Sequence, residues 1–388
     1  MNIAVNARFL IKDKLEGIGW FTNETLKRIT KNNPQHTFYF FFDRKFDDSF
    51  IFSDNIIPVV INPPARHPLL WYVWFEYMVP YYLKKHKCDY FISQDGYLSL
   101  KTKIPTHLTI HDLAFEHFDD HVSKLTNKYY KHFTPLYAEK ASRIATVSNF
   151  SASDISEKYG INSEKIDVIP NGFNNRFKPV EKIKQKEIQD RVADGCPYFL
   201  FAGTIQPRKN LENLLKAYEH FRENNDSNIK LLVAGRKGWK YQEAIDIYES
   251  MKFKNDVIFL GHLTLDKLVD VMGAATALFY ISLFEGFGIP ILESFASGVP
   301  VVTSDRSSMP EVGGDAAIIV DPYNIESIAD SMKKIAVDNK FVEELVSKGI
   351  ERVKMFSWDI TADKLWESVS LSMAKDVLPL QEKLIKAP

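Results

Sequence analysis

Short strand-like runs alternate with helix-like amphipathic segments along this chain, and the alternation occurs twice. "NIAV" opens the first half and precedes a loop and the helical pattern "WFTNETLKRIT". "YFLFAGT" (198 to 204) opens the second half, before the loop "IQPRK" and the helical pattern "NLENLLKAYEHF". In that pattern Leu211, Leu214, Leu215 and Tyr218 share one face of a 3.6-residue period. Such alternation is typical of parallel sheets covered by helices. We therefore predict an α/β fold of two tandem Rossmann-like, doubly wound domains that face a cleft.

The length of 388 residues also favours two domains, since one hydrophobic core rarely serves so long a chain. The first domain is predicted over 1–172, where "KIDVIPNGF" closes a strand with a turn. The charged segment 173–195 lacks a strand pattern and is interpreted as a solvated linker. The second domain is predicted over 196–355, and a helical tail over 356–388 is expected to brace the two domains together.

The composition excludes several classes of protein. Hydrophobic residues make up 45% and charged residues 26% of the chain, and the formal net charge is -1. These values are typical of a globular protein and disfavour disorder or general nucleic-acid binding. Cys88 and Cys196 are the only cysteines, which provides neither a disulfide framework nor a cysteine zinc site. Arg8 interrupts any leader-like apolar run, and no later apolar run is long enough to span a bilayer. We expect a cytoplasmic protein that is neither exported nor membrane-spanning.

The segment "HPLLWYVWFEYMVPYYLKKHK" (67–87) combines many aromatic residues with a basic end. Glu76 and Pro80 make it a poor membrane-spanning helix. The favoured interpretation is an amphipathic helix packed in a core. The alternative is a peripheral contact with the inner face of a membrane, in which the aromatic rings lie at headgroup level and the lysines contact anionic lipid.

A glycine-rich stretch, "FEGFGIPILESFASGVPVV" (284–302), has a glutamate on either side of its loop, Glu285 and Glu293. Pro290 suits the first position of a helix, and Gly298 suits the left-handed position just after its end. A short helix over about 290–297 follows. Gly286 and Gly288 allow the backbone to approach a ligand and to direct N–H groups at it, and the helix start favours an anion such as phosphate.

Two ionised glutamates beside a phosphate would repel it unless each of them binds neutral hydroxyl groups. A ligand that carries a sugar on each side of a diphosphate satisfies that condition. The alternative is that Glu285 and Glu293 only cap the helix and interact with its dipole.

Four further motifs suggest ligand contacts. "GTIQPRKN" (203–210) brings Arg208 and Lys209 to the start of a helix, where adjacent cations oppose the dipole and need an anion such as a diphosphate; a solvated basic pair is the alternative. His111 ends the strand "LTIHDLAF" and would bind a sugar hydroxyl or leaving phosphate, unless it is simply packed.

The motif "EGIGW" places Gly17 and Gly19 in a second glycine loop before a helix, although a plain turn explains it equally well. In "LVAGRKGWK", the backbone that follows Gly235 would contact a nucleobase. The alternative is that Arg236 is only a solvated charge at the edge of the sheet. Ser308 and Glu311 have capping-box spacing, which predicts a helix cap.

Taken together, these motifs resemble the family 4 retaining glycosyltransferases with a GT-B fold, most closely the GDP-mannose-dependent mannosyltransferase branch. The resemblance extends over nearly the whole chain in the family's order. The matching motifs are "GIG", "HDLAF", "TVSNFS", "VIPNG", "GTIQPRKN", "LVAGRKGW", "FLGHL", "FEGFGIPILESFASGVPVVTS" and "PEVGGDAA".

The resemblance implies a role for each motif residue. Glu285 and the adjacent amides would hold the transferred sugar, Glu293 the ribose, and the pair Arg208 and Lys209 the diphosphate. His111 would lie by the transferred sugar. The implied catalytic residues are His111, Arg208, Lys209 and Glu285. The implied donor-binding residues are Gly17, Gly19, Gly203, Arg208, Lys209, Gly235, Arg236, His262, Leu263, Glu285, Gly286, Phe287, Gly288, Ile289 and Glu293. Trp20 departs from the smaller or basic residue expected after the first glycine loop.

The resemblance also implies a reaction, the transfer of mannose from GDP-mannose, with retention, to a glycan or lipid-linked acceptor in surface polysaccharide biosynthesis. A retaining hydrolase would need a second carboxylate about 5 Å from the first as nucleophile. Both glutamates are assigned to binding, so a front-face reaction is favoured, in which Arg208 and Lys209 stabilise the leaving phosphate. The chain has no D-x-D triplet, so neither a metal nor another cofactor is expected.

Other functions remain open at this stage. A UDP-sugar-dependent transferase of the same family would share these motifs. A sugar-nucleotide epimerase or a non-catalytic sugar-nucleotide-binding subunit is less favoured. A Rossmann oxidoreductase is disfavoured, because "GIGWFT" lacks the third glycine of the dinucleotide fingerprint and lies too far from the first strand.

Overall fold

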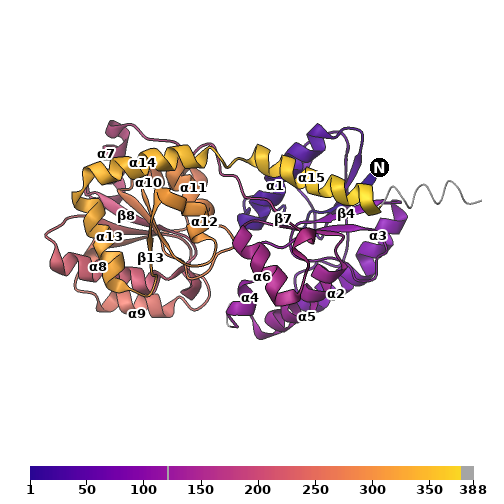
Figure 1. The fold of residues 1–388 in the computed structure, drawn as a ribbon, viewed down its shortest axis with the longest axis horizontal. Helices are drawn as coiled ribbons and strands as arrows, with labels where there is room; N and C mark the ends of the chain where they lie inside the picture. The colour runs from indigo at the N-terminus through magenta and orange to yellow at the C-terminus, as the bar shows by residue number, and fades with distance from the viewer. Residues whose placement is uncertain (120–121, 377–388) are drawn as a thin grey trace, which may run out of the picture. The chain divides into compact units, whose positions relative to one another are not determined.

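The computed structural model describes residues 1–119 and 122–376 and divides the chain into two compact units. Of the described residues, unit 1 comprises Met1–Gly172 and 357–376, and unit 2 comprises Phe173–Phe356. Both units are α/β layers in which helices cover the two faces of a parallel sheet (Figure 1). The predicted α/β fold of two Rossmann-like, doubly wound domains is confirmed.

Unit 1 contains a seven-stranded parallel sheet in the order β3-β2-β1-β4-β5-β6-β7. In register, Ala4 of β1 pairs with Tyr39 of β2 on one side and with Phe91 of β4 on the other. The central strands are buried on both faces, as their continuous hydrophobic runs predict. The strands are β1 (Asn2–Asn6), β2 (Thr37–Phe42), β3 (Ile56–Val60), β4 (Tyr90–Ser93), β5 (Thr106–Thr109), β6 (Arg143–Thr146) and β7 (Ile166–Val168).

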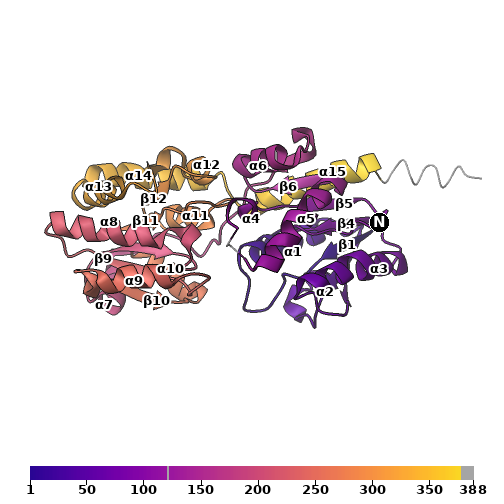
Figure 2. The same cartoon turned by 90° about the horizontal axis from the view of Figure 1, so that it is seen from below.

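Helices cover both faces of this sheet, and Figure 2 shows α2 and α3 following one another along one side of the unit. The π-helical segment η2 joins α2 to α3. The helices are α1 (Gly17–Asn32), α2 (Pro68–Val73), η2 (Trp74–Met78), α3 (Val79–Lys85), α4 (Ala114–His117), α5 (Lys124–Lys140), α6 (Asn149–Tyr159) and α15 (Trp358–Asp376), with short 3-10 turns at η1 (Asp48–Phe50) and η3 (Ser163–Lys165).

The predicted tail 356–388 forms α15, which packs in unit 1 as far as Asp376. Trp366 lies 5.6 Å from the ring of His36, and the Ser368 hydroxyl lies 2.8 Å from Nε2 of His107 on β5. The remainder of the predicted tail, 377–388, lies outside the described residues. That the tail braces the two domains stays a prediction.

Unit 2 contains a six-stranded parallel sheet in the order β10-β9-β8-β11-β12-β13. The predicted apolar face of the first helix is confirmed, since Leu211, Leu214, Leu215 and Tyr218 of α8 are all buried in the core. The strands are β8 (Tyr198–Ala202), β9 (Lys230–Ala234), β10 (Val257–Gly261), β11 (Ala277–Tyr280), β12 (Val301–Ser304) and β13 (Ala317–Val320).

The helices of unit 2 form two layers. In Figure 1, α8, α9 and α13 cover one face of the sheet, and α7, α10, α11 and α14 cover the other. The helices are α7 (Lys182–Ala193), α8 (Leu211–Asn224), α9 (Gln242–Ser250), α10 (Leu265–Gly273), α11 (Ile289–Ala296), α12 (Met309–Gly313), α13 (Ile325–Val337) and α14 (Asn339–Val353), with 3-10 turns at η4 (Pro207–Lys209), η5 (Lys254–Asp256) and η6 (Gly314–Ala316).

The predicted linker 173–195 belongs to unit 2, and its residues 182–193 form α7, which packs against α10. The buried residues of α7 are Ile188 and Ala193. Lys184 and Arg191 form ion pairs with the carboxylate of Asp270 on α10, at 3.0 and 3.1 Å. The charge run therefore has partners in the fold that its composition alone did not reveal.

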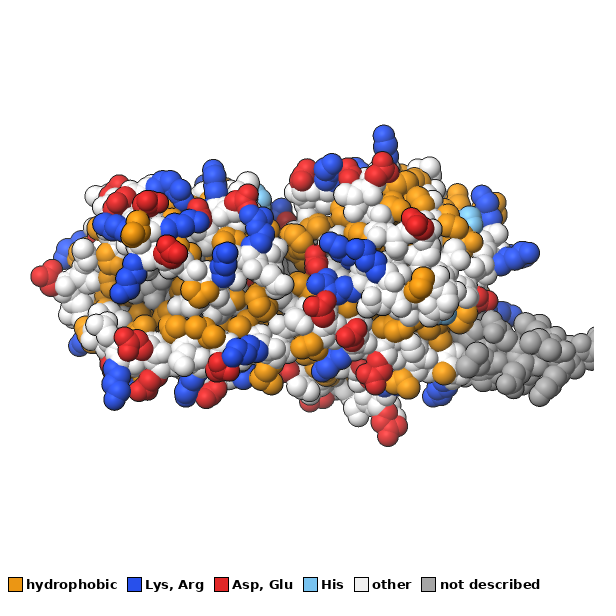
Figure 3. Space-filling view, turned by 90° about the horizontal axis from the view of Figure 1, so that it is seen from above, with side chains coloured by type: hydrophobic (Ala, Val, Ile, Leu, Met, Phe, Trp, Pro, Cys, Tyr) orange, Lys and Arg blue, Asp and Glu red, His pale blue; other side chains and the backbone are white. Residues whose placement is uncertain are grey.

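The surface carries charges of both signs. On the face drawn in Figure 3, lysine and arginine side chains are interspersed with aspartate and glutamate side chains, in keeping with the net charge of -1. Within the part of the chain that the structure describes, no helix has both the length and the apolar character needed to cross a bilayer.

Candidate functional site

The strand order of unit 2 reverses between β8 and β11, so the segments that follow these two strands meet at the carboxyl edge of the sheet. The Leu283 N–H donates to the Arg208 carbonyl at 2.8 Å, and the Asn210 side chain donates to the Ile281 carbonyl at 3.2 Å. Open α/β sheets bind ligands at this switch point. The predicted donor-binding residues of unit 2 all follow strands at this edge: Gly203, Arg208 and Lys209 after β8, Gly235 and Arg236 after β9, His262 and Leu263 after β10, and Glu285 to Ile289 and Glu293 after β11.

Arg208, Lys209 and Glu285 form one ion-paired cluster at the switch point. Nη1 of Arg208 lies 2.8 Å from Oε2 of Glu285, and Nζ of Lys209 lies 2.5 Å from Oε1. Arg208 Nη1 also donates to the Phe284 carbonyl at 2.6 Å. The three side chains are 13%, 12% and 9% exposed, so little water screens the pairing.

This cluster corrects the expectation that the two cations need a phosphate as their counter-anion, because Glu285 supplies one. Their predicted position at a strand-to-helix turn agrees with the structure. The cations lie on the 3-10 turn η4, and Asn210, in the left-handed conformation with φ 59°, separates them from the first residue of α8.

The electrostatics of the cluster determine the charge of Glu285. Burial disfavours the carboxylate, but the neighbouring Arg208 and Lys209 outweigh that effect and lower the pKa of Glu285 to about 2. The glutamate is thus ionised at neutral pH.

Tyr280 completes the cluster and was not predicted. Its hydroxyl lies 2.6 Å from Nζ of Lys209, whose ammonium also lies 4.7 Å from the centroid of the tyrosine ring. Burial raises the pKa of Tyr280 well above its usual value, so the phenol stays neutral. The signal in the sequence was an aromatic residue with a polar tip at the end of the otherwise apolar strand β11.

The loop that follows Glu285 is held by two serines. The Glu285 N–H donates to Oγ of Ser307 at 2.9 Å, and the Ser308 hydroxyl lies 2.9 Å from the carbonyls of both Glu285 and Phe287. The predicted capping box is therefore wrong, since the Ser308 side chain makes no cap bond to α12. The hydroxyl instead donates to two carbonyl groups that are distant in the sequence and lie near it only in the folded protein.

The predicted short helix is confirmed as α11, Ile289–Ala296, with Pro290 in its first turn and Gly298 left-handed at φ 68° just after it. Gly288, which precedes the helix, has φ 108°, and a Cβ there would lie 2.8 Å from the Met309 methyl group. Neither Glu285 nor Glu293 caps α11, so the capping interpretation of the pair is wrong.

Glu293 is partly buried on α11 and, among the described residues, its carboxyl group makes no hydrogen bond or ion pair. Burial raises the pKa of Glu293 to about 8. The two glutamates therefore lie in different surroundings. Glu285 is charged and neutralised by its neighbours, whereas the surroundings of Glu293 favour its neutral form.

Gly235 has a packing role. A Cβ on Gly235 would lie 1.8 Å from the Gly203 carbonyl oxygen. The Gly235 N–H donates to the Gly261 carbonyl at 2.9 Å. Glycine is thus required for the close approach of the loops after β8 and β9. Gly203 in turn lies beside the Lys209 side chain, since its Cβ would contact Lys209 Cε at 3.6 Å.

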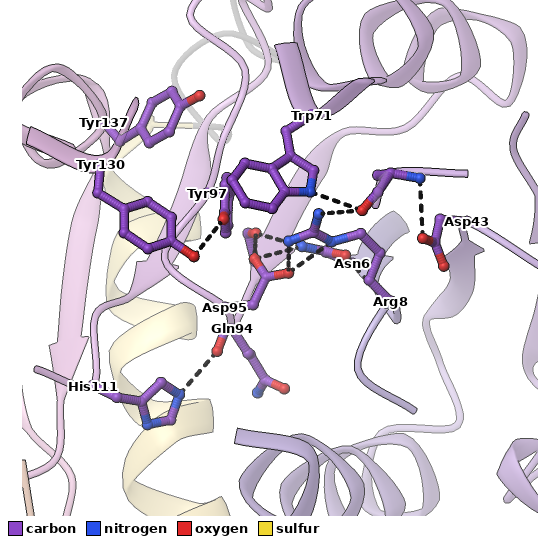
Figure 4. Close-up of polar contacts among 12 residues, drawn as sticks. Asn6, Arg8, Asp43, Trp71, Gln94, Asp95, Tyr97, His111, Tyr130 and Tyr137 are labelled. Atoms are coloured by element: carbon purple, nitrogen blue, oxygen red, sulfur yellow. Dashed lines mark hydrogen bonds and ion pairs between the residues drawn. The ribbon is translucent and has the colours of Figure 1, made fainter. Parts of the chain in front are cut away.

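The switch point of unit 1 lies between β1 and β4 and holds a second buried ion pair, which was not predicted (Figure 4). Nε and Nη2 of Arg8 lie 3.0 and 2.7 Å from Oδ2 of Asp95, and Nδ2 of Asn6 lies 2.8 Å from Oδ1. The guanidinium lies 4.5 Å from the ring centroid of Tyr97. An arginine and an aspartate, each directly after a buried strand, were the available signal.

His111 lies in the same unit, and its Nε2 is 2.9 Å from the carbonyl oxygen of Gln94, the residue before Asp95. Burial lowers the pKa of His111, although the bond to Gln94 opposes this. In the neutral ring Nε2 is then the donor, which leaves Nδ1 as an acceptor. The His111 ring packs edge-on against Phe21 of α1, with the ring centroids 4.9 Å apart, so His111 is packed in unit 1.

The second predicted glycine loop is corrected. Gly17 and Gly19 form the first turn of α1 rather than a loop before it. A Cβ on Gly17 would meet no atom within 4 Å, whereas one on Gly19 would lie 3.1 Å from the Phe9 carbonyl oxygen. Only Gly19 is therefore required by local packing.

Comparison with known families gives two matches, one in each unit. Residues 16–176 match the family described as Glycosyltransferase Family 4, and residues 182–352 match the family described as Glycosyl transferases group 1.

Two curated relatives are O-antigen enzymes. The chain is 27% identical over 254 residues to O-antigen chain mannosyltransferase B of Escherichia coli, which covers 65% of this chain and 66% of that protein. It is 27% identical over 284 residues to O-antigen chain mannosyltransferase RfbU of Salmonella typhimurium, which covers 72% of this chain and 74% of that one.

Solved structures share the fold at low sequence identity. Anabaena Alr3699/HepE in complex with UDP-glucose superposes with a TM-score of 0.74 and 16% identity, over 95% of this chain and 99% of that chain. WaaG, a glycosyltransferase involved in lipopolysaccharide biosynthesis, has a TM-score of 0.72 and 14% identity, over 94% and 98%. The family matches in both units and the shared architecture confirm the resemblance read from the motifs: the chain belongs to the family 4 glycosyltransferases and has their GT-B fold.

Proposed function

We propose that the protein transfers mannose from GDP-mannose, with retention of anomeric configuration, to a glycan or lipid-linked saccharide in surface polysaccharide biosynthesis. The similarity to O-antigen mannosyltransferases supports the sugar and the class of acceptor. The observation that carries the chemistry is the buried cluster of Arg208, Lys209 and Glu285 at the switch point of unit 2, with Glu293 on the helix that follows.

In this proposal the diphosphate of the donor replaces Glu285 as the partner of one or both cations of the cluster. Arg208 and Lys209 then contact phosphate oxygens, which are strong acceptors for charged donors. Glu285, released from one or both cations, accepts hydrogen bonds from hydroxyls of the transferred sugar. Gly286 to Gly288 and the start of α11 direct backbone N–H groups at the same anion.

The same residues support a front-face reaction. As the sugar–phosphate bond breaks, negative charge grows on the leaving phosphate, and Arg208 and Lys209 stabilise it. A leaving phosphate oxygen accepts the proton of the acceptor hydroxyl. Tyr280, bonded to Lys209, keeps that ammonium in place. His111 offers Nδ1 to a hydroxyl of the sugar substrate.

Glu293 is assigned to the ribose hydroxyls of the nucleotide. Hydroxyls that donate to its carboxylate would favour the ionised form, so binding would lower the pKa of Glu293 from about 8. His262, Leu263, Gly235 and Arg236, which follow the neighbouring strands, are proposed to line the nucleoside end.

The proposal includes no metal or other cofactor, because the chain has no D-x-D triplet and two cations already lie at the switch point. It also assigns the protein to the cytoplasm, since Cys88 and Cys196 are free thiols, as a reducing compartment would leave them.

Titration calorimetry of the full chain against GDP, UDP, GDP-mannose, UDP-glucose and UDP-N-acetylglucosamine, with EDTA present, tests the donor. Selective binding of guanine nucleotides supports the proposal. Selective binding of uridine nucleotides would replace the donor by a UDP-sugar, and binding that requires added metal would contradict the metal-free mechanism. Binding to none of the five would contradict the switch-point assignment.

The anomeric configuration is tested by nuclear magnetic resonance of the product formed on a saccharide acceptor. An α-linked product from an α-linked donor supports retention, and an inverted product would refute it. Conversion of the donor with no acceptor present would instead indicate an epimerase.

A further inference from the structure

The helix formed by α2, η2 and α3 has one buried and one exposed side. Trp74, Phe75, Val79 and Leu83 pack in the core of unit 1, which confirms the core interpretation of the segment 67–87. The other side carries large apolar or aromatic residues in the open. We define the aromatic stripe as Leu69, Tyr72, Val73, Tyr77 and Tyr81, which are 69%, 36%, 37%, 53% and 59% exposed.

The π-helical segment keeps this stripe on one side. In a regular α-helix, every step of four residues overshoots a full turn by about 40°, so residues 69, 73, 77 and 81 would drift around the helix. The i to i+5 geometry of η2, seen in the bond from the Val79 N–H to the Trp74 carbonyl, turns less per residue and offsets that drift. The local winding thus produces a continuous stripe.

The exposed charges of the helix that carries the stripe are of one sign, although the neighbouring helix α5 also exposes Glu139. Between residues 62 and 88, the exposed lysine, arginine, aspartate and glutamate side chains are Arg66, Lys84, Lys85 and Lys87, all cations. The one carboxylate of the helix, Glu76, is buried and accepts hydrogen bonds from the backbone N–H groups of Leu100 and Lys101, at 2.9 and 3.1 Å.

Two neighbouring elements extend the surface. The Lys101 ammonium lies 3.6 Å from the centroid of the Tyr77 ring, which adds a cation beside the stripe. Helix α5 packs alongside, with Phe133 5.8 Å from Tyr72, and exposes Leu125 (49%) and Leu136 (37%). Lys128 and His132, both exposed, lie between these two leucines at helical spacing.

We propose that the aromatic stripe and its flanking cations form a docking surface for an anionic lipid bilayer. Tyrosines with an apolar ring and a polar tip are suited to the headgroup level, and lysines and arginines to the negative surface. A protein partner fits less well, because lysine is depleted from protein interfaces. The surface would hold the enzyme beside a membrane and is independent of which nucleotide sugar it uses.

Sedimentation of the full chain with vesicles tests the proposal. Vesicles of phosphatidylcholine are compared with vesicles that also contain about 30 mol% phosphatidylglycerol, because only the latter offer the cations a partner. The wild-type protein is expected to sediment with the anionic vesicles, and less so as salt screens the attraction.

Two sets of variants separate the apolar and the charged contributions. Leu69→Ser/Tyr77→Ser/Tyr81→Ser and Lys84→Glu/Lys85→Glu are each expected to lower vesicle partitioning by at least about tenfold, since each basic residue near the surface contributes about fivefold. The matched controls Ile183→Ser/Tyr323→Ser/Val337→Ser and Lys333→Glu/Lys340→Glu make the same number of changes at exposed residues of unit 2 and are expected to bind as the wild type does.

Three results would overturn the proposal: no binding of the wild type to anionic vesicles, equal binding by the stripe variants and their controls, or a dimer in solution that the stripe variants abolish. Thermal unfolding of every variant shows whether lost binding reflects lost folding. Nucleotide binding by the stripe variants is expected to stay unchanged, so failure of this proposal is distinguishable from failure of the proposed function.

Discussion

At the scale of single residues, two glutamates that follow the same strand have pKa values shifted in opposite directions. Glu285 is buried against Arg208 and Lys209, which lower its pKa to about 2, and Glu293 is partly buried without such partners, which raises its pKa to about 8. Their neighbours, rather than their residue type, give the two carboxyl groups different chemistry.

Arg208→Ala is expected to lower kcat by at least about 100-fold, which corresponds to about 2.7 kcal/mol of transition-state stabilisation. The reason is that Arg208 both balances Glu285 and is assigned to the leaving phosphate. Steady-state kinetics with the preferred donor measure the fall in kcat. Arg222→Ala is the matched control, because Arg222 is equally shielded and pairs with Asp256 at 2.6 Å in the same unit. Similar kcat values for the two variants would remove Arg208 from the mechanism.

Glu293→Gln is expected to change how stability depends on pH. The pKa of Glu293 is raised in the folded protein from 4.5 to about 8. The stability gained by burying the neutral form is complete below about pH 4.5 and is lost as the pH rises through about 8. The variant avoids this loss, so its Tm relative to the wild type should rise between about pH 5 and pH 9. Glu326→Gln, an exposed first-turn residue of α13, should show no such trend. A constant Tm difference for Glu293→Gln would contradict the assignment.

At the scale of elements, the loop between β11 and α11 is held by hydrogen bonds to two serines that follow β12. Ser307 and Ser308 bind the backbone of Glu285 and Phe287, so the start of α12 determines the path of the glycine loop. This connection explains why a serine with capping-box spacing does not cap its own helix.

Ser308→Ala is expected to reduce the free energy of unfolding by about 1–3 kcal/mol, because it leaves buried carbonyl groups without a donor. Turnover should also fall, since Glu285 lies in the loop that is released. Urea unfolding and steady-state kinetics measure the two effects. Ser331→Ala removes a buried hydroxyl that bonds only the Ile328 carbonyl of its own helix, and it should affect stability less and turnover not at all. Equal effects of both changes would contradict the special role of Ser308.

At the scale of the whole molecule, each unit has a buried ion pair at the point where its strand order reverses. In unit 1, Arg8 after β1 meets Asp95 after β4; in unit 2, Arg208 and Lys209 after β8 meet Glu285 after β11. The pair in unit 1 is 5% and 4% exposed and joins the two central strands.

Arg8→Met is expected to cost about 3–5 kcal/mol of stability, because Asp95 becomes a buried charge without its partner. Arg8→Met/Asp95→Leu should recover much of that loss, since replacing both members of a buried pair is often nearly neutral. A double-mutant cycle by urea unfolding measures the coupling. Additive losses in the double variant would show that the pair is not coupled.

The sequence alone determined the features that depend on local pattern. The alternation of strands and helices specified two doubly wound units, and Pro290 and Gly298 specified the ends of α11, because hydrophobic period and backbone preference act within a few residues. The order of the motifs identified the family and placed the residues that we predict to bind the donor in unit 2 after their strands.

The tertiary structure decided which charges meet. Arg208 and Glu285 lie 77 positions apart and Arg8 and Asp95 87 apart, so no local pattern could pair them. The pKa of Glu293, the carbonyl partners of Ser308 and the packing of α7 on α10 likewise depend on neighbours distant in the sequence. Coulomb attraction and desolvation act through space, so their outcome required the positions of all surrounding groups.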